Sequence, residues 1–196
     1  MGLDTAAGAV FAALGLSGAA GFNAWLPLFV SALLDRLEVV DLSEPFDRFS
    51  STAGLIVLGV LAAADFVGDK IPVVDHVLHL AGGVIAPVSG ALLFAGPTAD
   101  ETSLPSIVAL VLGALVAGSV HTARATIRPA ATATTAGIAN PVLSLGEDLS
   151  SGALTVLAFA APILAAALLV ALAIALIVAW RRLARWSSGR GGGRRL

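Results

Sequence analysis

Five apolar runs separated by short polar intervals restrict the fold of this chain more than any other feature. The runs cover residues 5–34, 52–67, 73–95, 104–120 and 152–180. Several reach the length of about 20 residues that a helix needs to cross the hydrocarbon core of a bilayer. The chain is 58% hydrophobic and only 12% charged, whereas soluble domains carry about 25% charged residues. We therefore expect a polytopic membrane protein and exclude a soluble fold.

The apolar runs predict helices and not strands. In lipid, every backbone N–H and C=O group must be hydrogen-bonded within the protein, which leaves helices and closed barrels as the spanning structures. The runs lack the alternating apolar and polar residues of a barrel strand. The predicted fold is all-α, with about five transmembrane helices that form a single domain over residues 1–180.

Charge is distributed unevenly along the chain and predicts its orientation. Residues 181–196 hold six arginines and no acid, whereas the first 180 residues hold five basic and thirteen acidic side chains, a net charge of −8. Basic flanks mark the cytoplasmic side of a membrane helix. We therefore expect a cytoplasmic C-terminus and, with five spans, an external N-terminus. The tail 181–196 is expected to be disordered, to anchor the topology or hold anionic lipid headgroups, and not to bind nucleic acid.

Two stretches of sequence predict breaks in the helices. AGFNAWLPL at 20–28 and AGIANPVLSL at 136–145 share an Ala-Gly pair, an Asn and a Pro. Paired broken helices are typical of inverted-repeat transporters. We therefore expect a weak inverted repeat and a broken or re-entrant element over 130–146, although the biased composition also produces such likeness by chance. Asn23 and Asn140 would either line a path or form an interhelical hydrogen bond.

The densest group of ionisable side chains lies between the second and third runs, in DFVGDKIPVVDHVLH at 65–79. Asp65 and Asp69 are four residues apart, so they share one face of a continuing helix. Asp75 and His79 repeat that spacing at the start of the third run. The proline between the two pairs favours a tight turn followed by a new helix. This segment is therefore predicted to form an acidic hairpin.

The acidic hairpin favours a cation or proton site, and ordinary solvation of two helix ends is the alternative. Carboxylate and imidazole groups that converge near a membrane interface bind divalent cations or pass protons. In the alternative, Asp75 caps a helix N-terminus and Lys70 neutralises Asp69. Asp65 fits this alternative poorly, because it follows GLIVLGVLAAA with no polar neighbour. The candidate ligands for a metal ion are Asp65, Asp69, His76 and His79.

A second polar group follows the fourth run. His121, Arg124 and Arg128 lie at i, i+3 and i+7, which places them on one face of a helix. In a five-span arrangement this basic face lies on the same external side as the acidic hairpin, which favours ion pairing between them. Glu147 and Asp148 are expected at the start of the fifth helix, where acids interact favourably with the helix dipole.

Three motifs carry a resemblance to a known family. They are D-K-I-P-x-x-D at 69–75, I-x-P-x-x-G-A at 85–91 and L-S-L-G-E-D at 143–148. With these motifs the chain resembles domain-of-unknown-function family 4126, a family of bacterial integral membrane proteins, over most of residues 5–178. The resemblance implies a multi-pass protein of the bacterial inner membrane without an established activity. In that family an Arg usually precedes the proline of the second motif, where this chain has Ala86.

Together these features favour a small membrane transporter or channel that moves an ion or small solute. The acidic hairpin would bind the cation or proton, Asn23 and Asn140 would line the path, and His79 or His121 would relay protons. We expect a homo-oligomer in the bilayer, no cofactor, and a divalent cation only as substrate or ligand. The main alternative is a non-transporting scaffold or partner subunit that docks through the charged hairpin. A lipid-processing enzyme that uses Asp75 and His79 is least favoured, because the sequence shows no nucleophile–base arrangement.

The substitution Asp65→Asn is expected to abolish transport and leave folding intact, because it removes a charge and preserves the side-chain volume. Flux into proteoliposomes measures the first effect, and size-exclusion chromatography of the purified variant measures the second. Unchanged flux would rule out Asp65 as the cation or proton site.

Overall fold

The computed structural model describes residues 5–42, 46–68, 72–135, 138 and 140–191. In these residues the chain forms the helices α1 (Ala6–Phe22), α2 (Leu26–Arg36), α3 (Thr52–Gly68), α4 (Pro72–Thr98), α5 (Ser106–Thr135), α6 (Asn140–Ala160) and α7 (Pro162–Gly191). A 3₁₀ helix, η1 (Phe46–Ser50), precedes α3. The described part of the chain contains no strand, which confirms the all-α prediction.

The helices have the lengths and surfaces of a membrane protein. Four segments are long and apolar enough to cross a bilayer, namely Leu80–Thr98, Ser106–Pro129, Asn140–Ala160 and Pro162–Arg182. α1 and α3 are also apolar but have 17 residues each. Large apolar side chains are exposed on α3, α4, α5 and α7, among them Val60, Val84, Leu115 and Ile163. Apolar surface of this extent suits contact with lipid, and the protein is a polytopic helical membrane protein.

α1 is the central helix of the bundle. It packs against α4, α5, α6 and α7, and all its residues from Ala12 to Phe22 are buried except Leu14. Small side chains let neighbouring membrane helices approach closely, and α1 consists mainly of Ala and Gly. Two interhelical hydrogen bonds use its polar groups: the Ser17 hydroxyl donates to the Gly90 carbonyl on α4 at 2.9 Å, and Ser151 on α6 donates to the Ala19 carbonyl at 3.0 Å.

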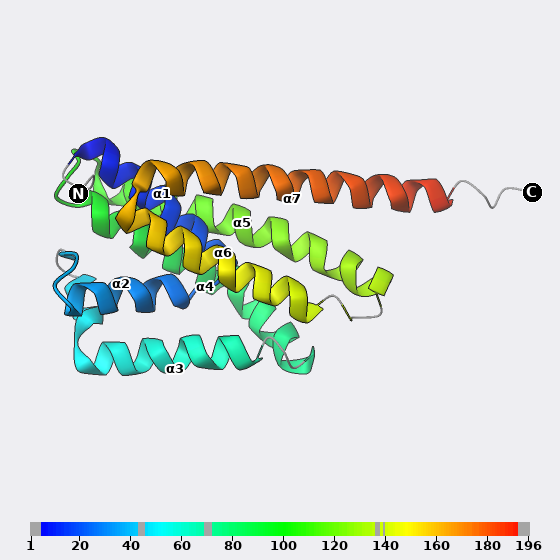
Figure 1. Cartoon of the computed structure of the whole chain (residues 1–196), viewed down its shortest axis with the longest axis horizontal. Helices are drawn as coiled ribbons and strands as arrows, with labels where there is room; N and C mark the ends of the chain where they lie inside the picture. The colour runs from blue at the N-terminus through cyan, green and yellow to red at the C-terminus, as the bar shows by residue number, and fades with distance from the viewer. Residues whose placement is uncertain (1–4, 43–45, 69–71, 136–137, 139, 192–196) are drawn as a thin grey trace, which may run out of the picture.

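The first apolar run forms a hairpin of two short helices and not one span. α1 ends at Phe22 and α2 begins at Leu26, with Pro27 in the first turn of α2, a position that tolerates the missing N–H. Figure 1 shows α2 running back toward the end of the molecule where α1 begins. The break predicted from AGFNAWLPL is confirmed, and the chain reverses its direction there.

The predicted single helix over 152–180 is wrong, because the chain is interrupted at Ala161 between α6 and α7. Pro162 cannot donate a backbone hydrogen bond, and it disfavours helical conformation at the residue before it. It is well suited to the first turn of the next helix, which is where it stands in α7. The fifth run therefore contributes to two helices.

Of the broken or re-entrant element predicted over 130–146, the break is confirmed, because α5 ends at Thr135 and α6 starts at Asn140. In the described residues, this segment consists of the end of α5 and the start of α6. Pro141 occupies the first turn of α6, which starts at Asn140 and continues without a break to Ala160. A full-length helix therefore replaces the short element.

The directions of the helices determine at which end of the molecule successive helices meet. From α3 to α7, each helix runs opposite to the one before it, and the start of α1 and the end of α7 lie at opposite ends of the molecule (Figure 1). The end of α3 and the start of α4, like the end of α5 and the start of α6, lie at the end of the molecule where α7 ends (Figure 1), whereas the five-span arrangement placed them opposite to the C-terminus. The difference arises because the α1–α2 hairpin returns to its own side and α6 adds a crossing. The weak inverted repeat stays a prediction.

α7 continues as a helix through Gly191. Residues 181–191 are therefore not part of the disordered tail that the sequence predicts. Leu, Ala and Arg have high intrinsic helix propensity, and they dominate the segment that follows Trp180. Arg181, Arg182 and Arg185 are exposed.

α4 and α5 cross with their backbones in contact. A Cβ atom added to Gly90 would overlap Ala117 and lie 2.7 Å from the carbonyl oxygen of Gly113, and a Cβ atom added to Gly113 would overlap the carbonyl oxygen of Gly90. Glycine is required at both positions because backbone atoms cannot move aside as a flexible side chain can.

The substitution Gly90→Ala is expected to lower the free energy of unfolding by about 1–3 kcal/mol, because the added methyl group overpacks this crossing. The matched control is Gly83→Ala on the same helix, where an added Cβ atom meets nothing within 4 Å. Thermal unfolding in detergent, followed by circular dichroism, measures both variants. Equal melting temperatures for Gly90→Ala and Gly83→Ala would contradict the close crossing.

Candidate functional site

The break after α1 is organised by a single side chain, Asn23. Its backbone is extended, with φ −142° and ψ 120°, which ends α1. Its side-chain oxygen accepts hydrogen bonds from the backbone N–H groups of Trp25 and Leu26, both at 3.0 Å. These donors lie at the N-terminus of α2 and have no partner within that helix. Asn23 thus ends one helix and caps the next.

Asn23 also joins the tip of the α1–α2 hairpin to α6. Its Nδ2 atom donates to Oδ1 of Asp148 at 2.9 Å. The side chain is 4% exposed, so this amide–carboxylate hydrogen bond lies inside the bundle. Of the two roles that the sequence allows for Asn23, the interhelical hydrogen bond is the one observed.

Arg124 on α5 meets the other side of the same break. Its Nη1 atom donates to the carbonyl oxygen of Phe22, the last residue of α1, and to Oε2 of Glu147 at 2.9 Å. A cation at a helix C-terminus is favourable because it faces the negative end of the helix dipole. Its Nη2 atom lies 3.3 Å from Nδ1 of His121, one turn earlier on α5. Arg124 therefore connects α1, α5 and α6.

Arg128 completes the group by holding Glu147 from a second direction. Its Nη2 atom donates to Oε2 of Glu147 at 2.5 Å and its Nε atom donates to Oε1 at 3.3 Å, so the guanidinium meets both carboxylate oxygens. The side chains of Arg124, Arg128 and Glu147 are 15%, 11% and 13% exposed. We call Asn23, His121, Arg124, Arg128, Glu147 and Asp148 the tip cluster.

The predicted basic face of His121, Arg124 and Arg128 is therefore present, but its described acidic partner is Glu147 on α6. Glu147 and Asp148 are not helix-start acids, because α6 starts at Asn140 and has no acid in its first turn. They lie about two turns inside the helix, on the side that faces α1 and α5. Asn140 begins α6 and is half-buried.

A cavity of about 240 Å³ adjoins the tip cluster. Arg124, Arg128 and Glu147 form its charged part. The rest of its lining is mainly apolar and comes from the end of α1 and from α5, α6 and α7: Phe22, Ile127, Val142, Leu143, Leu172 and Leu176. The arrangement offers charged hydrogen-bonding groups on one side and a hydrophobic surface on the other.

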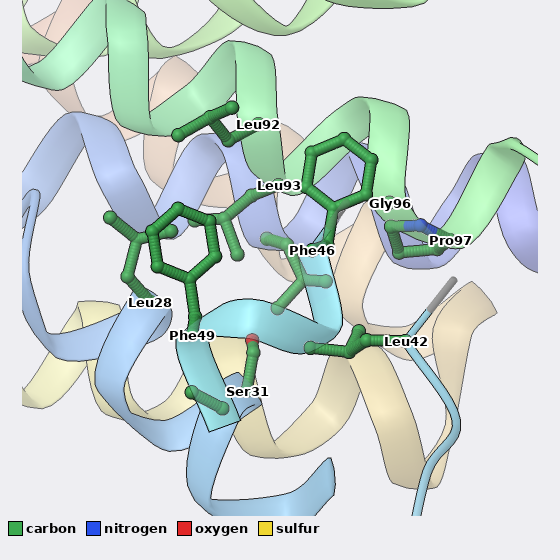
Figure 2. Close-up of a pocket in the computed structure, with 11 residues that line it drawn as sticks. Leu28, Ser31, Leu42, Phe46, Phe49, Leu92, Leu93, Gly96 and Pro97 are labelled. Carbon is green, nitrogen blue, oxygen red and sulfur yellow. The ribbon is translucent and has the colours of Figure 1, made fainter. Parts of the chain in front are cut away.

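A second cavity, near η1, is much smaller. It measures about 20 Å³ and is lined mainly by apolar side chains. Figure 2 shows Ser31 among Leu28, Phe46 and Phe49. The Ser31 hydroxyl is buried and has no hydrogen-bond partner in the described part of the chain. A space of this size holds about one water molecule, so it is too small for a solute.

The acidic hairpin is described only in part. Asp69 and Lys70 lie outside the described residues, and for Asp75, His76 and His79 the structure describes the backbone in α4 but not the side chains. Asp65 lies on α3, is half-buried and has an interaction partner. α3 packs against α2, η1 and α4, whereas the tip cluster lies on α1, α5 and α6.

No metal site is evident in the part of the chain that the structure describes. There, no three His, Asp or Glu side chains lie close enough to hold a metal ion. The metal ligands suggested by the sequence include Asp69, His76 and His79, whose side chains fall outside that part. A metal site in the acidic hairpin therefore stays a prediction.

Some contacts of the site were not predicted. The Phe22 carbonyl receives Arg124 through the backbone, and no side-chain pattern indicates such an acceptor. Ser151 holds α6 against α1 near the break. Its position four residues after Glu147 is a signal, because residues at this spacing share a helix face.

Comparison with known families identifies the group to which the chain belongs. The family model described as Domain of unknown function (DUF4126) matches residues 10–182. Because this match spans most of the chain, the protein belongs to that family, as its motifs indicated. No curated protein and no solved structure matches the chain.

The substitution Asn23→Ala is expected to lower the free energy of unfolding by about 1–2 kcal/mol through loss of the α2 cap, with a further loss from the broken link to Asp148. The control is Thr5→Ala, which removes the cap of α1: Thr5 is exposed and accepts from the Gly8 N–H at 3.1 Å. Thermal unfolding in detergent measures both variants. An equal or smaller loss for Asn23→Ala would contradict the interhelical role.

Proposed function

We propose that this member of the DUF4126 family is a small membrane transporter or channel for an ion or small solute. Its path would pass the tip of the α1–α2 hairpin through the cavity beside Arg124, Arg128 and Glu147. The observation that carries the proposal is a helix break inside an apolar bundle, faced by four charged side chains. The finding that the protein is a polytopic helical membrane protein is the premise.

The first support is the energetic cost of the tip cluster. Charged side chains within membrane helices are expensive, and they are usually found where they line a pathway or a water-filled cavity. A buried ion pair contributes little net stability, because desolvation offsets much of the attraction between its partners. The Arg128–Glu147 pair lies beside a cavity. A role in conduction or binding explains both the costly burial of this pair and its position at the cavity.

The second support is the shape of the hairpin. Non-helical backbone at membrane depth is tolerated where it is buried in protein or lines a cavity. Half-helix ends that meet near the midplane are a common way to form a solute site, because their dipoles and free backbone groups point at the ligand. The C-terminus of α1 and the N-terminus of α2 meet at Asn23, where Asn23 and Arg124 bind backbone groups of the two helix ends.

The acidic hairpin fits the same proposal as a cation or proton site at the mouth of the path. The end of α3, where the acidic hairpin begins, and the end of α5 lie at the same end of the molecule (Figure 1). The exposed Arg181, Arg182 and Arg185 near the end of α7 favour a cytoplasmic location for that end. In this orientation the hairpin α1–α2 would enter from the opposite side of the inner membrane.

Reconstitution into proteoliposomes tests the proposal. Influx of protons, potassium, chloride and short-chain carboxylates is measured for the natural protein and for Arg128→Gln. Arg128→Gln is expected to reduce influx about tenfold or more, because one charge-assisted contact of about 1.5–3 kcal/mol is lost. Glu147 keeps its bond to Arg124 in this variant, which preserves the link between α5 and α6.

Glu101→Gln is the matched control, because Glu101 is exposed on the α4–α5 connection at the other end of the protein. It should leave influx unchanged. Equal influx for Arg128→Gln and Glu101→Gln would contradict a path at the tip cluster, and a natural protein that moves none of the solutes would contradict transport. Loss of influx in Asp65→Asn alone would place the path at the acidic hairpin.

A further inference from the structure

The Glu147 carboxylate occupies a position that a bound anion would take. Oε2 receives hydrogen bonds from both Arg124 and Arg128, at 2.9 and 2.5 Å, and Oε1 receives one from Arg128 at 3.3 Å. Guanidinium groups bind carboxylates through such forked, charge-assisted contacts. The two arginines therefore form a carboxylate-binding site that the chain fills with its own side chain.

The donors at this site are not used up by Glu147. The Nε atom of Arg124 is buried and has no hydrogen-bond partner among the described residues. A buried donor without a partner costs about 1–3 kcal/mol. A ligand oxygen that reached Arg124 from the cavity would remove this cost. Asp148 does not bind this Nε atom; its Oδ1 atom accepts a hydrogen bond from Asn23.

The cavity defines what else the ligand must contain. Beyond the charged groups, its lining is mainly the apolar side chains of α5, α6 and α7 together with Phe22. Its volume of about 240 Å³ suits a small organic molecule and is far above the space of about 10–15 Å³ that one water needs. Small-molecule sites commonly combine an apolar lining with a few polar groups that fix orientation.

We infer that the tip cluster binds a small organic carboxylate with a short apolar tail, and that Glu147 is its internal competitor. The ligand carboxylate takes the place of Glu147 at Arg124 and Arg128, and the tail lies against the apolar lining. A cation in the same place is disfavoured, because the two positively charged guanidinium groups would repel it. This inference deepens the proposed function by naming the substrate class of the same site.

Equilibrium dialysis of radiolabelled butyrate against the purified full-length protein in neutral detergent tests the inference. Glu147→Gln is expected to raise butyrate affinity about tenfold, because the amide no longer competes for two charge-assisted contacts. Arg128→Gln should abolish binding. Glu101→Gln, at the other end of the protein, should match the natural protein.

Two further measurements separate competition from a change in folding. Glu147→Asp keeps the charge but withdraws it by one methylene group, and a smaller rise in affinity is expected. This variant decides the outcome if Glu147→Gln does not yield monodisperse protein. Butyramide, which has the same tail without the charge, should bind equally weakly to all variants. Unchanged butyrate affinity in the folded Glu147 variants, or a parallel rise for butyramide, would overturn the inference.

The result is distinguishable from a failure of the proposed function. If butyrate binds as expected and no solute enters proteoliposomes, the carboxylate site stands and transport is wrong. If Arg128→Gln reduces solute influx while butyrate binding does not respond to Glu147, transport stands and the substrate class is wrong.

Discussion

The hydrogen bond from Arg124 to the carbonyl of Phe22 is the contact on which the rest of the architecture depends. A helix that ends inside an apolar bundle leaves its last carbonyl groups without water, and a missing partner is costly in such surroundings. The guanidinium supplies the partner and a favourable charge at once. Without it, α1 would have to continue to the membrane surface or unravel.

A positive charge inside the bundle requires acidic side chains nearby to balance it. Glu147 neutralises Arg124, and it also receives Arg128, so the three side chains together keep one positive charge. Asp148 carries the matching negative charge and accepts a hydrogen bond from Asn23, the residue at the break. The same charged side chains therefore stabilise the reversal of the chain and line the adjoining cavity.

Local properties of this chain were predictable from sequence, whereas its partner choices were not. Apolar run length predicts helices in lipid, and the spacing of Arg124 and Arg128 predicts a shared face, because both depend on neighbouring residues only. A break near residue 23 is predictable because Asn23 and Pro27 both favour helix ends. Whether the chain continues or reverses there depends on how α1 packs against α4, α5, α6 and α7, and no local pattern carries that information.

The role of Glu147 was missed because of two helix boundaries. Pro162 divides the fifth run and Pro141 starts a helix well before it, so an acid expected in a first turn lies in a helix interior. A proline marks a boundary without saying how far the helix extends from it. The side chains of the acidic hairpin fall largely outside the described residues, so its role as a cation site stays a prediction.

The crossing of α4 and α5 at Gly90 and Gly113 has a mechanical consequence. Backbone lies directly on backbone there, so no rotamer change can absorb a relative shift of the two helices. α4 and α5 must therefore move together as one rigid unit, and Arg124 and Arg128 on α5 move with it. Any change in access to the cavity beside the tip cluster then requires movement of α1, α6 or α7, the other helices that line it.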